Sequence, residues 1–562
     1  MIARSAPALL FAAALGAASQ APPPGRFELS DITADAGLRF THYTGAAGRK
    51  YLPEALGAGA AFVDIDRDGW QDIIVANGTD WPGSGARGKA PTAAVFRNDH
   101  RGGFSDVTSK SGLDVPMYGM GVTAADFDND GLDDVLITAV GQSRLFHNAG
   151  NGRFVDVTER AGLGGRTAFS TSATWIDFDR DGFVDLFICN YVRWTPETDI
   201  FCSADGKRKS YCTPEAYPGA TSWLFRNKGN GTFEDVTAAA GLLDPTSKAL
   251  GVTMLDYNRD GWPDLFVAND TQPNKLYRNT GDGRFVEAAL EAGLAFSEDG
   301  RARAGMGTDA ADLDNSGVPS VVVTNFSGEM LGLYTPTPAG HYEDRAPHSE
   351  VGSATRLTLG FGCFFFDVDL DGRLDLLVVN GHIDDGLRNA SGRVDYAEAP
   401  HLFHNEGGRF VDVAAQAGAE FAAPKVARGA AFADVDLDGD LDVLITTNGG
   451  PIHLYRNQVT APHQAVRVTL RGSRSNRDAI GARVRLRVGG SWLTRSVRAG
   501  SSYLSQSELP LTFGLGANPS ADEAIVEWPG GRQEKIGALA GGRAYVIEEG
   551  RGITTTTPLA GR

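Results

Sequence analysis

The sequence of 562 residues is poor in cysteine and histidine, with four and ten residues respectively. None of the cysteines has the paired CxxC spacing of a zinc site, so a thiolate zinc domain is excluded. Beyond the N-terminus, no apolar run approaches the roughly 20 residues that cross a bilayer, and no membrane span is predicted. Basic residues are outnumbered by acidic ones, 52 to 70. This balance argues against a nucleic-acid partner, because nucleic-acid binders show a basic surface.

Residues 1–21 have the pattern of a secretory signal peptide. Arg4 precedes an apolar run from about Ala8 to Ala18, and small residues suited to cleavage follow up to Ala21. Residues 22–26 form a short linker in this interpretation. We therefore expect an exported protein, either secreted or located in the periplasm or cell envelope.

The cysteines fall into two pairs with different surroundings. Cys202 and Cys212 lie ten residues apart in a polar segment, where an exported protein is expected to close a small disulfide loop. Cys189 and Cys363 lie in apolar, strand-like runs, so we expect them to be buried small hydrophobic residues.

An acidic nine-residue pattern, D-x-D-x-D-G-x-x-D, recurs seven times along the chain. Each copy follows a segment of small and apolar residues and precedes a run such as DIIVAN or DLFVAN, and both flanks are typical of strands. The spacing of the copies suits one four-stranded blade for each. The copies begin at Asp64, Asp126, Asp177, Asp256, Asp312, Asp367 and Asp434.

Two further strands recur in step with the loop. An L-[FY]-[RH]-N strand begins at Val95, Leu145, Leu224, Leu276, Leu402 and Leu454, with a degenerate copy at Leu333. A strand of the type FVDVT begins at Phe104, Phe154, Phe233, Phe285 and Phe410, with a degenerate copy at His341.

The seventh FVDVT-type strand is missing after Leu454, but residues 27–33, FELSDIT, supply one at the N-terminus. Closing the last blade with this strand would remove two exposed sheet edges, whereas an open stacked array would have no use for it. We therefore predict an all-β fold in which residues 27–460 form a closed seven-bladed β-propeller.

The acidic loop has the chemistry of a calcium site. Ca²⁺ takes six to eight oxygen ligands, which alternate Asp residues supply, and the Gly at position six permits the turn. An EF-hand is rejected because its acidic position twelve is apolar here, as at Val75 and Ile137. Asp-Gly turns without metal would explain one loop but not six, because clustered carboxylates repel one another.

We predict calcium at up to six loops. The fifth loop, from Asp312, is degraded because Ser316 and Ser320 replace two Asp residues, and Asn258 in the fourth keeps an oxygen. The predicted ligands are Asp64, Asp66, Asp68 and Asp72; Asp126, Asp128, Asp130 and Asp134; Asp177, Asp179, Asp181 and Asp185; Asp256, Asn258, Asp260 and Asp264; Asp367, Asp369, Asp371 and Asp375; and Asp434, Asp436, Asp438 and Asp442.

Catalytic candidates are weak. His382 with Asp384 and Asp385 is the best, but a surface turn explains it better, and His42 with Glu54 is weaker still. In five units an Asn also lies thirteen residues after the first loop Asp, with a sixth one place later, and these residues could either close turns or rim a binding face. These residues are Asn77, Asn190, Asn269, Asn325, Asn380 and Asn448.

The repeats resemble the FG-GAP/VCBS repeats of integrin-like propellers. The later segments NRDAIGARVRLRV from Asn476, RAGSSYLSQSELPLTFGLG from Arg498 and IVEWPGGRQEKI from Ile525 are similar to the ASPIC/UnbV domain. This domain follows such propellers in the cartilage acidic protein family and its bacterial relatives. The resemblance implies a small β-sandwich-like domain at residues 463–549, calcium in the blades and an extracellular setting, but no reaction. Residues 550–562 are expected to be a flexible tail.

Arg483, Arg485 and Arg487 alternate along one predicted strand of this domain. They could form a solvated face, dock on the acidic propeller or bind an anionic partner. For the whole chain we predict a secreted calcium-binding module that binds a protein or glycan. A cell-envelope enzyme or enzyme accessory that uses the central funnel of the propeller, and a structural component, are the alternatives. The sequence does not predict the partner or the oligomeric state.

Overall fold

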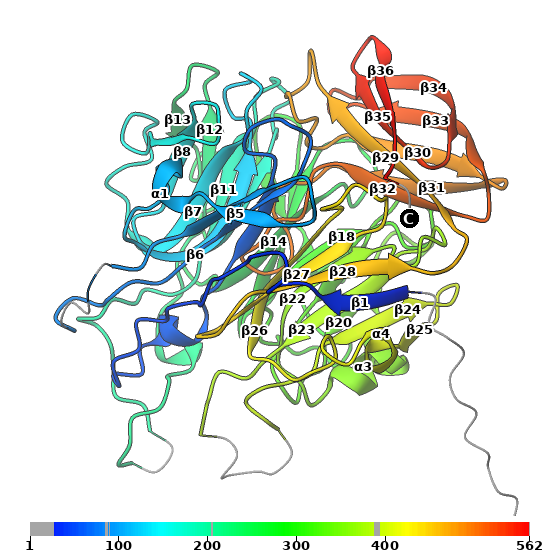
Figure 1. Cartoon of the computed structure of the whole chain (residues 1–562). Helices are drawn as coiled ribbons and strands as arrows, with labels where there is room; N and C mark the ends of the chain where they lie inside the picture. The colour runs from blue at the N-terminus through cyan, green and yellow to red at the C-terminus, as the bar shows by residue number, and fades with distance from the viewer. Residues whose placement is uncertain (1–26, 85–87, 89, 204–205, 387–393, 561–562) are drawn as a thin grey trace, which may run out of the picture.

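The computed structural model describes residues 27–84, 88, 90–203, 206–386 and 394–560 (Figure 1). The predicted signal peptide at residues 1–21 and the linker at residues 22–26 lie outside these residues. Strands dominate the fold, with short helices between them. In the part of the chain that is described, no helix is long and apolar enough to cross a membrane.

Seven four-stranded antiparallel arrays, called units one to seven here, build the larger part of the molecule. Units one to three comprise β2 (Ala60–Val63), β3 (Asp72–Val75), β4 (Ala94–Asn98) and β5 (Phe104–Asp106); β6 (Tyr118–Ala125), β7 (Asp134–Gly141), β8 (Arg144–Asn148) and β9 (Phe154–Asp156); and β10 (Ala168–Ile176), β11 (Asp185–Asn190), β12 (Trp223–Asn227) and β13 (Phe233–Asp235). Units two and three share one eight-stranded sheet, because β7 also pairs with β10.

The remaining four units follow the same order. They comprise β14 (Ala249–Leu255), β15 (Asp264–Asn269), β16 (Lys275–Asn279) and β17 (Phe285–Glu287); β18 (Thr308–Ala311), β19 (Ser320–Val323), β20 (Gly332–Pro336) and β21 (Tyr342–Asp344); β22 (Gly360–Phe366), β23 (Asp375–Asn380), β24 (His401–Asn405) and β25 (Phe410–Asp412); and β26 (Ala427–Ala433), β27 (Asp442–Thr447), β28 (His453–Val459) and β1 (Phe27–Asp31). Short helices lie at α1 (Thr108–Ser111), α2 (Ala289–Ala292), α3 (Glu350–Thr355), α4 (Ala414–Ala417), η1 (Leu52–Ala55), η2 (Pro214–Ala216) and η3 (Ala346–His348).

The units form a closed ring. The first strand of each unit packs on the first strand of the next, from β2 through β6, β10, β14, β18 and β22 to β26, and β26 packs back on β2. In unit seven, the N-terminal strand β1 pairs with β28, with Phe27 opposite Val459 and Asp31 opposite Tyr455. The predicted all-β propeller closed by its N-terminal strand is therefore confirmed.

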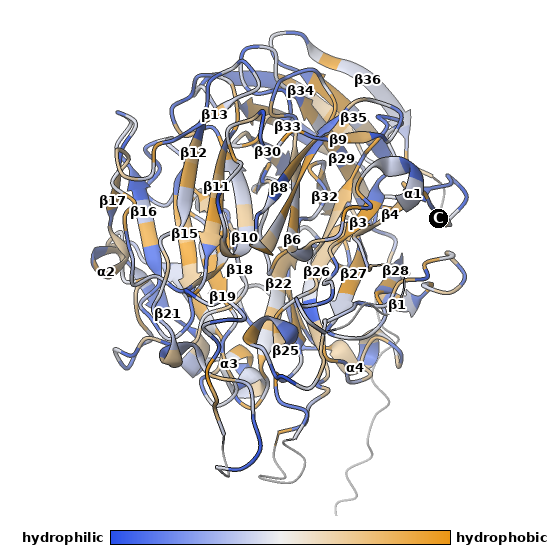
Figure 2. Cartoon of the chain, turned by 90° about the vertical axis from the view of Figure 1, so that its left-hand side faces the viewer, coloured by the Kyte–Doolittle hydropathy of each residue, from blue (hydrophilic) through white to orange (hydrophobic). Residues whose placement is uncertain are grey.

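The core lies between neighbouring units. Second strands such as β11 and β23 are buried along their whole length, which is why their sequences are continuous apolar runs (Figure 2). One cluster joins Phe364 and Leu377 of unit six to Val443 and Tyr455 of unit seven. Burial between units therefore holds the ring together.

The C-terminal domain consists of two four-stranded sheets, as expected for a small β-sandwich-like domain. One sheet has the order β32 (Leu511–Gly516), β29 (Gln464–Arg471), β35 (Arg543–Glu548) and β36 (Gly552–Pro558), and the other β31 (Ser491–Ser496), β30 (Arg483–Val488), β33 (Ser520–Glu527) and β34 (Gln533–Ala540). Its core is continuous with that of units two and three, where Trp528 and Val484 belong to the same cluster as Trp175.

The expectation of a flexible tail at residues 550–562 is wrong for its described part. Gly552–Pro558 form β36, which pairs with β35, and the backbone N–H groups of Leu559 and Ala560 donate to Gly542 and Leu437. The segment GITTTTP is rich in β-branched residues, which favour strands. This local signal was available in the sequence.

A segment of the C-terminal domain, residues 499–508, lies among the first strands of the ring, and we call it the axial segment. Its residues bond to the first strands of units one, two, three, five, six and seven. The bonds include Phe62 N to Gln506 O, Val122 N to Leu504 O, Trp175 N to Ala499 O, Ser502 N to Thr308 O, Cys363 N to Ser502 Oγ and Phe432 N to Ser507 Oγ. Tyr503 is fully buried. The axial segment therefore occupies part of the centre of the ring, where the enzyme alternative places its site.

Small residues in front of the loops admit the axial segment. A Cβ atom on Gly59 would lie 2.0 Å from the carbonyl oxygen of Leu504, and one on Gly429 would lie 2.5 Å from Ser505 Oγ. The Gly/Ala-rich segments that precede the acidic loops are thus explained by the close approach of a second backbone.

Candidate metal centres

All seven acidic loops share one backbone conformation. The fourth residue is left-handed, with φ between 58° and 61°, and the Gly at position six has φ between 83° and 96°. The fourth residues, none of which is glycine, are Arg67, Asn129, Arg180, Arg259, Asn315, Leu370 and Leu437. Because the degraded fifth loop keeps this turn, the turn does not depend on a full set of carboxylates.

The carboxylate at position one is oriented in the same way in every copy. Its Oδ2 accepts the N–H of the loop glycine at 2.6–3.2 Å in all seven loops. Among the described residues, its Oδ1 is buried without a partner in five of them, at Asp177, Asp256, Asp312, Asp367 and Asp434. A buried oxygen without a donor is costly, and an oxygen-liganded cation would satisfy it.

Several loops bring their carboxylates close enough to share an ion. Single ligand atoms lie within 4.8 Å of one another in the sets Asp64, Asp66 and Asp72; Asp126, Asp128 and Asp130; Asp177, Asp179 and Asp185; Asp128, Asp134 and His147; and Asp369, Asp371 and His404. In loop four the Asn258 amide donates to Asp260 Oδ2 at 2.8 Å, so its nitrogen faces a neighbouring carboxylate. The donor sets named for loops one, two, three and six fit a divalent cation.

Burial and mutual repulsion make the bare clusters unfavourable. Burial, followed by nearby carboxylates, raises the pKa of Asp126 to about 8 and the pKa of Asp177 to about 7. Burial likewise raises the pKa of Asp434 to about 8, against the opposing effect of Arg467. A bound divalent cation would offset this cost by compensating the negative charge.

The carboxylate at position nine has a second role that the sequence did not reveal. In unit three, Asp185 Oδ2 accepts Phe178 N at 3.0 Å and Oδ1 accepts Asn227 N at 2.8 Å. Equivalent pairs of bonds occur at Asp72, Asp134, Asp264, Asp375 and Asp442. The residue therefore ties its loop to the third strand of its own unit.

The Asn of the L-[FY]-[RH]-N strand joins neighbouring units, and we call this bond the inter-unit latch. Asn227 Nδ2 donates to Val184 O of its own unit at 3.0 Å and to Phe127 O of unit two at 2.7 Å. The same latch runs from Asn98 to Val435, Asn148 to Ile65, Asn279 to Phe178 and Asn457 to Val368. The repeated Asn was the sequence signal for it. In unit five Pro336 stands at this position.

The residue before the latch Asn reaches the loop carboxylates. Arg97, Arg226 and Arg456 approach the position-three residues Asp66, Asp179 and Asp436 at 2.5, 2.7 and 3.2 Å. In units two and six this residue is His147 or His404. A cationic or ligating side chain therefore accompanies these loops.

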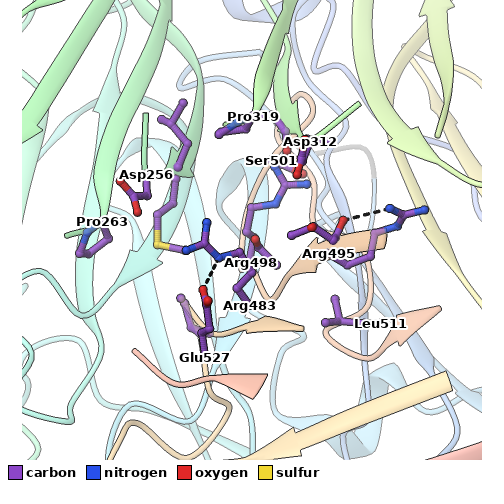
Figure 3. A pocket seen from close by; sticks show the side chains of 18 of the residues that line it. Asp256, Pro263, Asp312, Pro319, Arg483, Arg495, Arg498, Ser501, Leu511 and Glu527 are labelled. Atoms are coloured by element: carbon purple, nitrogen blue, oxygen red, sulfur yellow. Dashed lines mark hydrogen bonds and ion pairs between the residues drawn. The ribbon is translucent and has the colours of Figure 1, made fainter. Parts of the chain in front are cut away.

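The C-terminal domain covers the loop face of the ring. A cavity of about 420 Å³ lies between its strands and units three to seven. Arg483, Arg495 and Arg498 point into the cavity opposite Asp256 and Asp312 (Figure 3). Arg483 pairs with Glu527 at 2.6 Å, and Arg498 pairs with Asp309 at 2.8 Å. The arginines are therefore held by carboxylates of both domains.

The three alternating arginines of β30 have different surroundings, although the sequence left open whether they form a solvated face, dock on the propeller or bind an anionic partner. Arg483 docks on the propeller, where Nη1 donates to Gly317 O at 3.3 Å. Arg485 lies over the ring of Trp492, and Arg487 is exposed beside Glu523. One of the three therefore contacts the propeller.

The two histidines among the weak catalytic candidates are buried. His382 is buried, and its Nδ1 accepts Asp384 N at 3.1 Å in a turn that includes Asp385. His42 and Glu54 are buried, and burial lowers the pKa of His42 to about 3 and raises that of Glu54 to about 7. In the Asn register, Asn269 Nδ2 donates to Pro273 O and closes a turn, whereas Asn190 Nδ2 donates to Thr221 O, 31 residues further along the chain.

The cysteines lie as predicted. Cys202 and Cys212 form a disulfide with Cα atoms 5.2 Å apart. Cys189 and Cys363 are free thiols buried in β11 and β22. Cys212 is buried in the same core cluster as Phe169 and Phe361, and Cys202 packs against that cluster, so the disulfide fixes its loop to the core of the ring.

The chain is similar to several known proteins. Over 519 residues, the chain is 25% identical to cartilage acidic protein 1 of Homo sapiens, covering 88% of this chain and 72% of that protein. The mouse protein is 25% identical over 509 residues, covering 85% and 71%. Among solved structures, an Agrocybe aegerita lectin that recognises non-reducing terminal N-acetylglucosamine gives a TM-score of 0.38 at 15% identity, covering 63% of this chain and 79% of the lectin.

Two family descriptions match most of the chain. Residues 472–554 match the ASPIC and UnbV family. The FG-GAP-like repeat family matches residues 64–137, 126–188, 198–267, 256–323 and 367–445, which together exceed half of the chain. The chain therefore belongs to the FG-GAP-like repeat proteins and ends in an ASPIC and UnbV domain.

Proposed function

We propose that this chain is an exported, calcium-loaded propeller that acts as an interaction module for a protein or glycan partner. The observation that carries the calcium assignment is the buried Oδ1 at position one, which lacks a partner among the described residues in four of the six loops predicted to bind calcium, at Asp177, Asp256, Asp367 and Asp434. Carboxylate oxygens held at this spacing are ligands that Ca²⁺ prefers. The proposed export rests on the signal-peptide pattern and agrees with the disulfide.

A binding role is favoured by which surfaces remain accessible. The axial segment occupies part of the centre of the ring, and the C-terminal domain covers the loop face. The opposite face carries a groove of about 870 Å³, lined by Lys50, Tyr211, Tyr396 and Lys425 among others. Neither matched family is known as an enzyme family. We therefore assign partner binding to the opposite face.

Chelation tests the calcium assignment. The thermal midpoint of the purified full chain should fall when EDTA removes calcium and recover when calcium is restored, since a ligand that binds only the folded state stabilises it. Asp177→Asn, which removes one charge from loop three, should reduce this difference, whereas Asp312→Asn in the degraded loop should leave it nearly unchanged. Equal midpoints with and without EDTA would refute calcium binding.

Capture experiments test the binding assignment. The calcium-loaded chain should retain a partner on a glycan array or in a pull-down from an extracellular fraction. Lys50→Glu, on the opposite face, should reduce capture, while Arg551→Glu on the C-terminal domain should not. Turnover of a screened substrate without any stable partner would contradict an interaction module.

A further inference from the structure

Two of the seven units place an imidazole where the others place a guanidinium or no charge. His147 in β8 precedes the latch residue Asn148 of unit two, and His404 in β24 precedes Asn405, the Asn of the L-[FY]-[RH]-N strand in unit six. In the sequence these positions look interchangeable with arginine, because both side chains can be cationic. Their chemistry toward a metal differs, since a neutral imidazole nitrogen is a ligand and a guanidinium is not.

The loop of unit six is the more enclosed of the two. His404 Nε2 lies 3.2 Å from Asp369 Oδ2 and 4.0 Å from Asp371 Oδ2, and the His404 residue is only 9% exposed. Asp367, at position one of the same loop, is 1% exposed, and its Oδ1 has no partner among the described residues. Its Oδ2 accepts the loop's own Gly372 N–H at 3.0 Å. Among the described residues, no hydrogen-bond donor therefore reaches the buried Asp367 Oδ1.

A second imidazole stands at the same loop. His463 Nδ1 lies 2.6 Å from the carbonyl oxygen of Asp369. This residue lies just before β29, where the chain enters the C-terminal domain. The loop of unit six thus has nitrogen-bearing side chains on two sides.

The loop of unit two offers a similar set. His147 Nδ1 lies 3.0 Å from Asp134 Oδ1 and 3.4 Å from Asp128 Oδ2. Donors that bind a tetrahedral ion at about 2.0 Å are separated by roughly 3.3 Å. Both separations in unit two and the separation of His404 from Asp369 in unit six are close to this value, whereas His404 and Asp371 are 4.0 Å apart. The side chains need little movement to become ligands of one ion.

The donor chemistry distinguishes these units from the rest. Ca²⁺ takes oxygen ligands, whereas imidazole with carboxylate suits zinc and other divalent transition metals. We propose that units two and six bind a divalent transition-metal ion, zinc being the natural case, through Asp128, Asp134 and His147 and through Asp369, Asp371 and His404. The inference rests on the proposed role of the loops as metal sites and changes the ion in two of them.

Cobalt(II) provides a visible probe for such sites. The full chain, stripped with a chelator and returned to millimolar calcium, should retain one Co²⁺ for each of the two units after desalting, with the visible absorption of a nitrogen-liganded ion. H147R and H404R should each lose one ion and weaken Co²⁺ binding there about tenfold or more. H404Q serves as a second variant, because arginine is larger than the buried imidazole.

A gain of binding complements these losses. R226H places an imidazole beside Asp179 and Asp185 in unit three and should add a third Co²⁺. Unchanged Co²⁺ retention in the H147R/H404R double variant, or complete displacement of Co²⁺ by calcium in the wild type, would overturn the proposal. The calcium-dependent rise in thermal midpoint is measured in parallel. Its loss with Co²⁺ binding intact would refute the calcium function alone.

Discussion

Units three and five have the same loop backbone but different connections to the ring. In both, position four is left-handed and the position-one Oδ2 accepts the glycine N–H, at Asp177 and Asp312. Unit three adds Asp185 and the latch Asn227, whereas unit five has Ser320 and Pro336 at these positions. The turn is therefore set by the backbone and by position one. The carboxylate at position nine and the latch Asn act together, and both are absent from unit five.

Removing the hydrogen bonds that Asp185 accepts in unit three should have the largest effect on stability. Asp185→Ala leaves the buried N–H groups of Phe178 and Asn227 without acceptors, and each such group costs about 1–3 kcal/mol. We expect a loss of about 4 kcal/mol in the free energy of unfolding, measured by denaturant titration. Ser320→Ala should cost less than about 0.5 kcal/mol. Both variants are measured in excess EDTA, so that no metal contributes. Equal losses in the free energy of unfolding would show that the residue at position nine stabilises the chain only through a metal.

Replacing a buried carboxylate that lacks hydrogen-bond donors should stabilise the chain, in contrast to replacing Asp185. Glu54 is 1% exposed, and neither carboxylate oxygen has a partner among the described residues. Burial raises the pKa of Glu54 from 4.5 to about 7, so its contribution to stability is fully present below pH 4.5 and is lost as the pH rises through 7.

Glu54→Gln removes this titration. Its stability relative to wild type should rise from near zero at pH 5 to about 3 kcal/mol at pH 8, measured as unfolding free energy at each pH. Asp185→Asn, which keeps the shape but replaces an acceptor with a donor, should destabilise the chain at pH 8. Stabilisation by both substitutions would mean that donors to a buried carboxylate do not matter here.

Restoring the connection in unit five should have the smallest effect. The double substitution S320D/P336N supplies both missing residues on β19 and β20. The gain expected for the new hydrogen bonds is about 1 kcal/mol, read as a higher thermal midpoint. P336N alone, without the carboxylate, should not stabilise the chain. A double variant no more stable than P336N would show that the latch cannot form in this unit.

The repeats made the propeller predictable, because the same loop and strand signals recur and the displaced residues 27–33 complete the count. The double role of Asp185 was not predictable, since a metal ligand and an acceptor for backbone N–H groups have the same residue type. The axial segment was also missed. Its contacts are mostly with backbone atoms of distant strands, as between Ser502 and Thr308, and such contacts impose little pattern on either sequence.

The pairing of β1 with β28 and the insertion of the axial segment determine when folding of the ring can be completed during synthesis. Residues 27–31 leave the ribosome early but pair with residues 455–459, and the axial segment that bonds to six first strands is made later still. Contacts between such distant parts of a chain form slowly, because the entropy of loop closure must be overcome first. The ring is therefore expected to persist as an open intermediate with exposed strand edges until its final hundred residues arrive, and synthesis and folding must be protected over that interval.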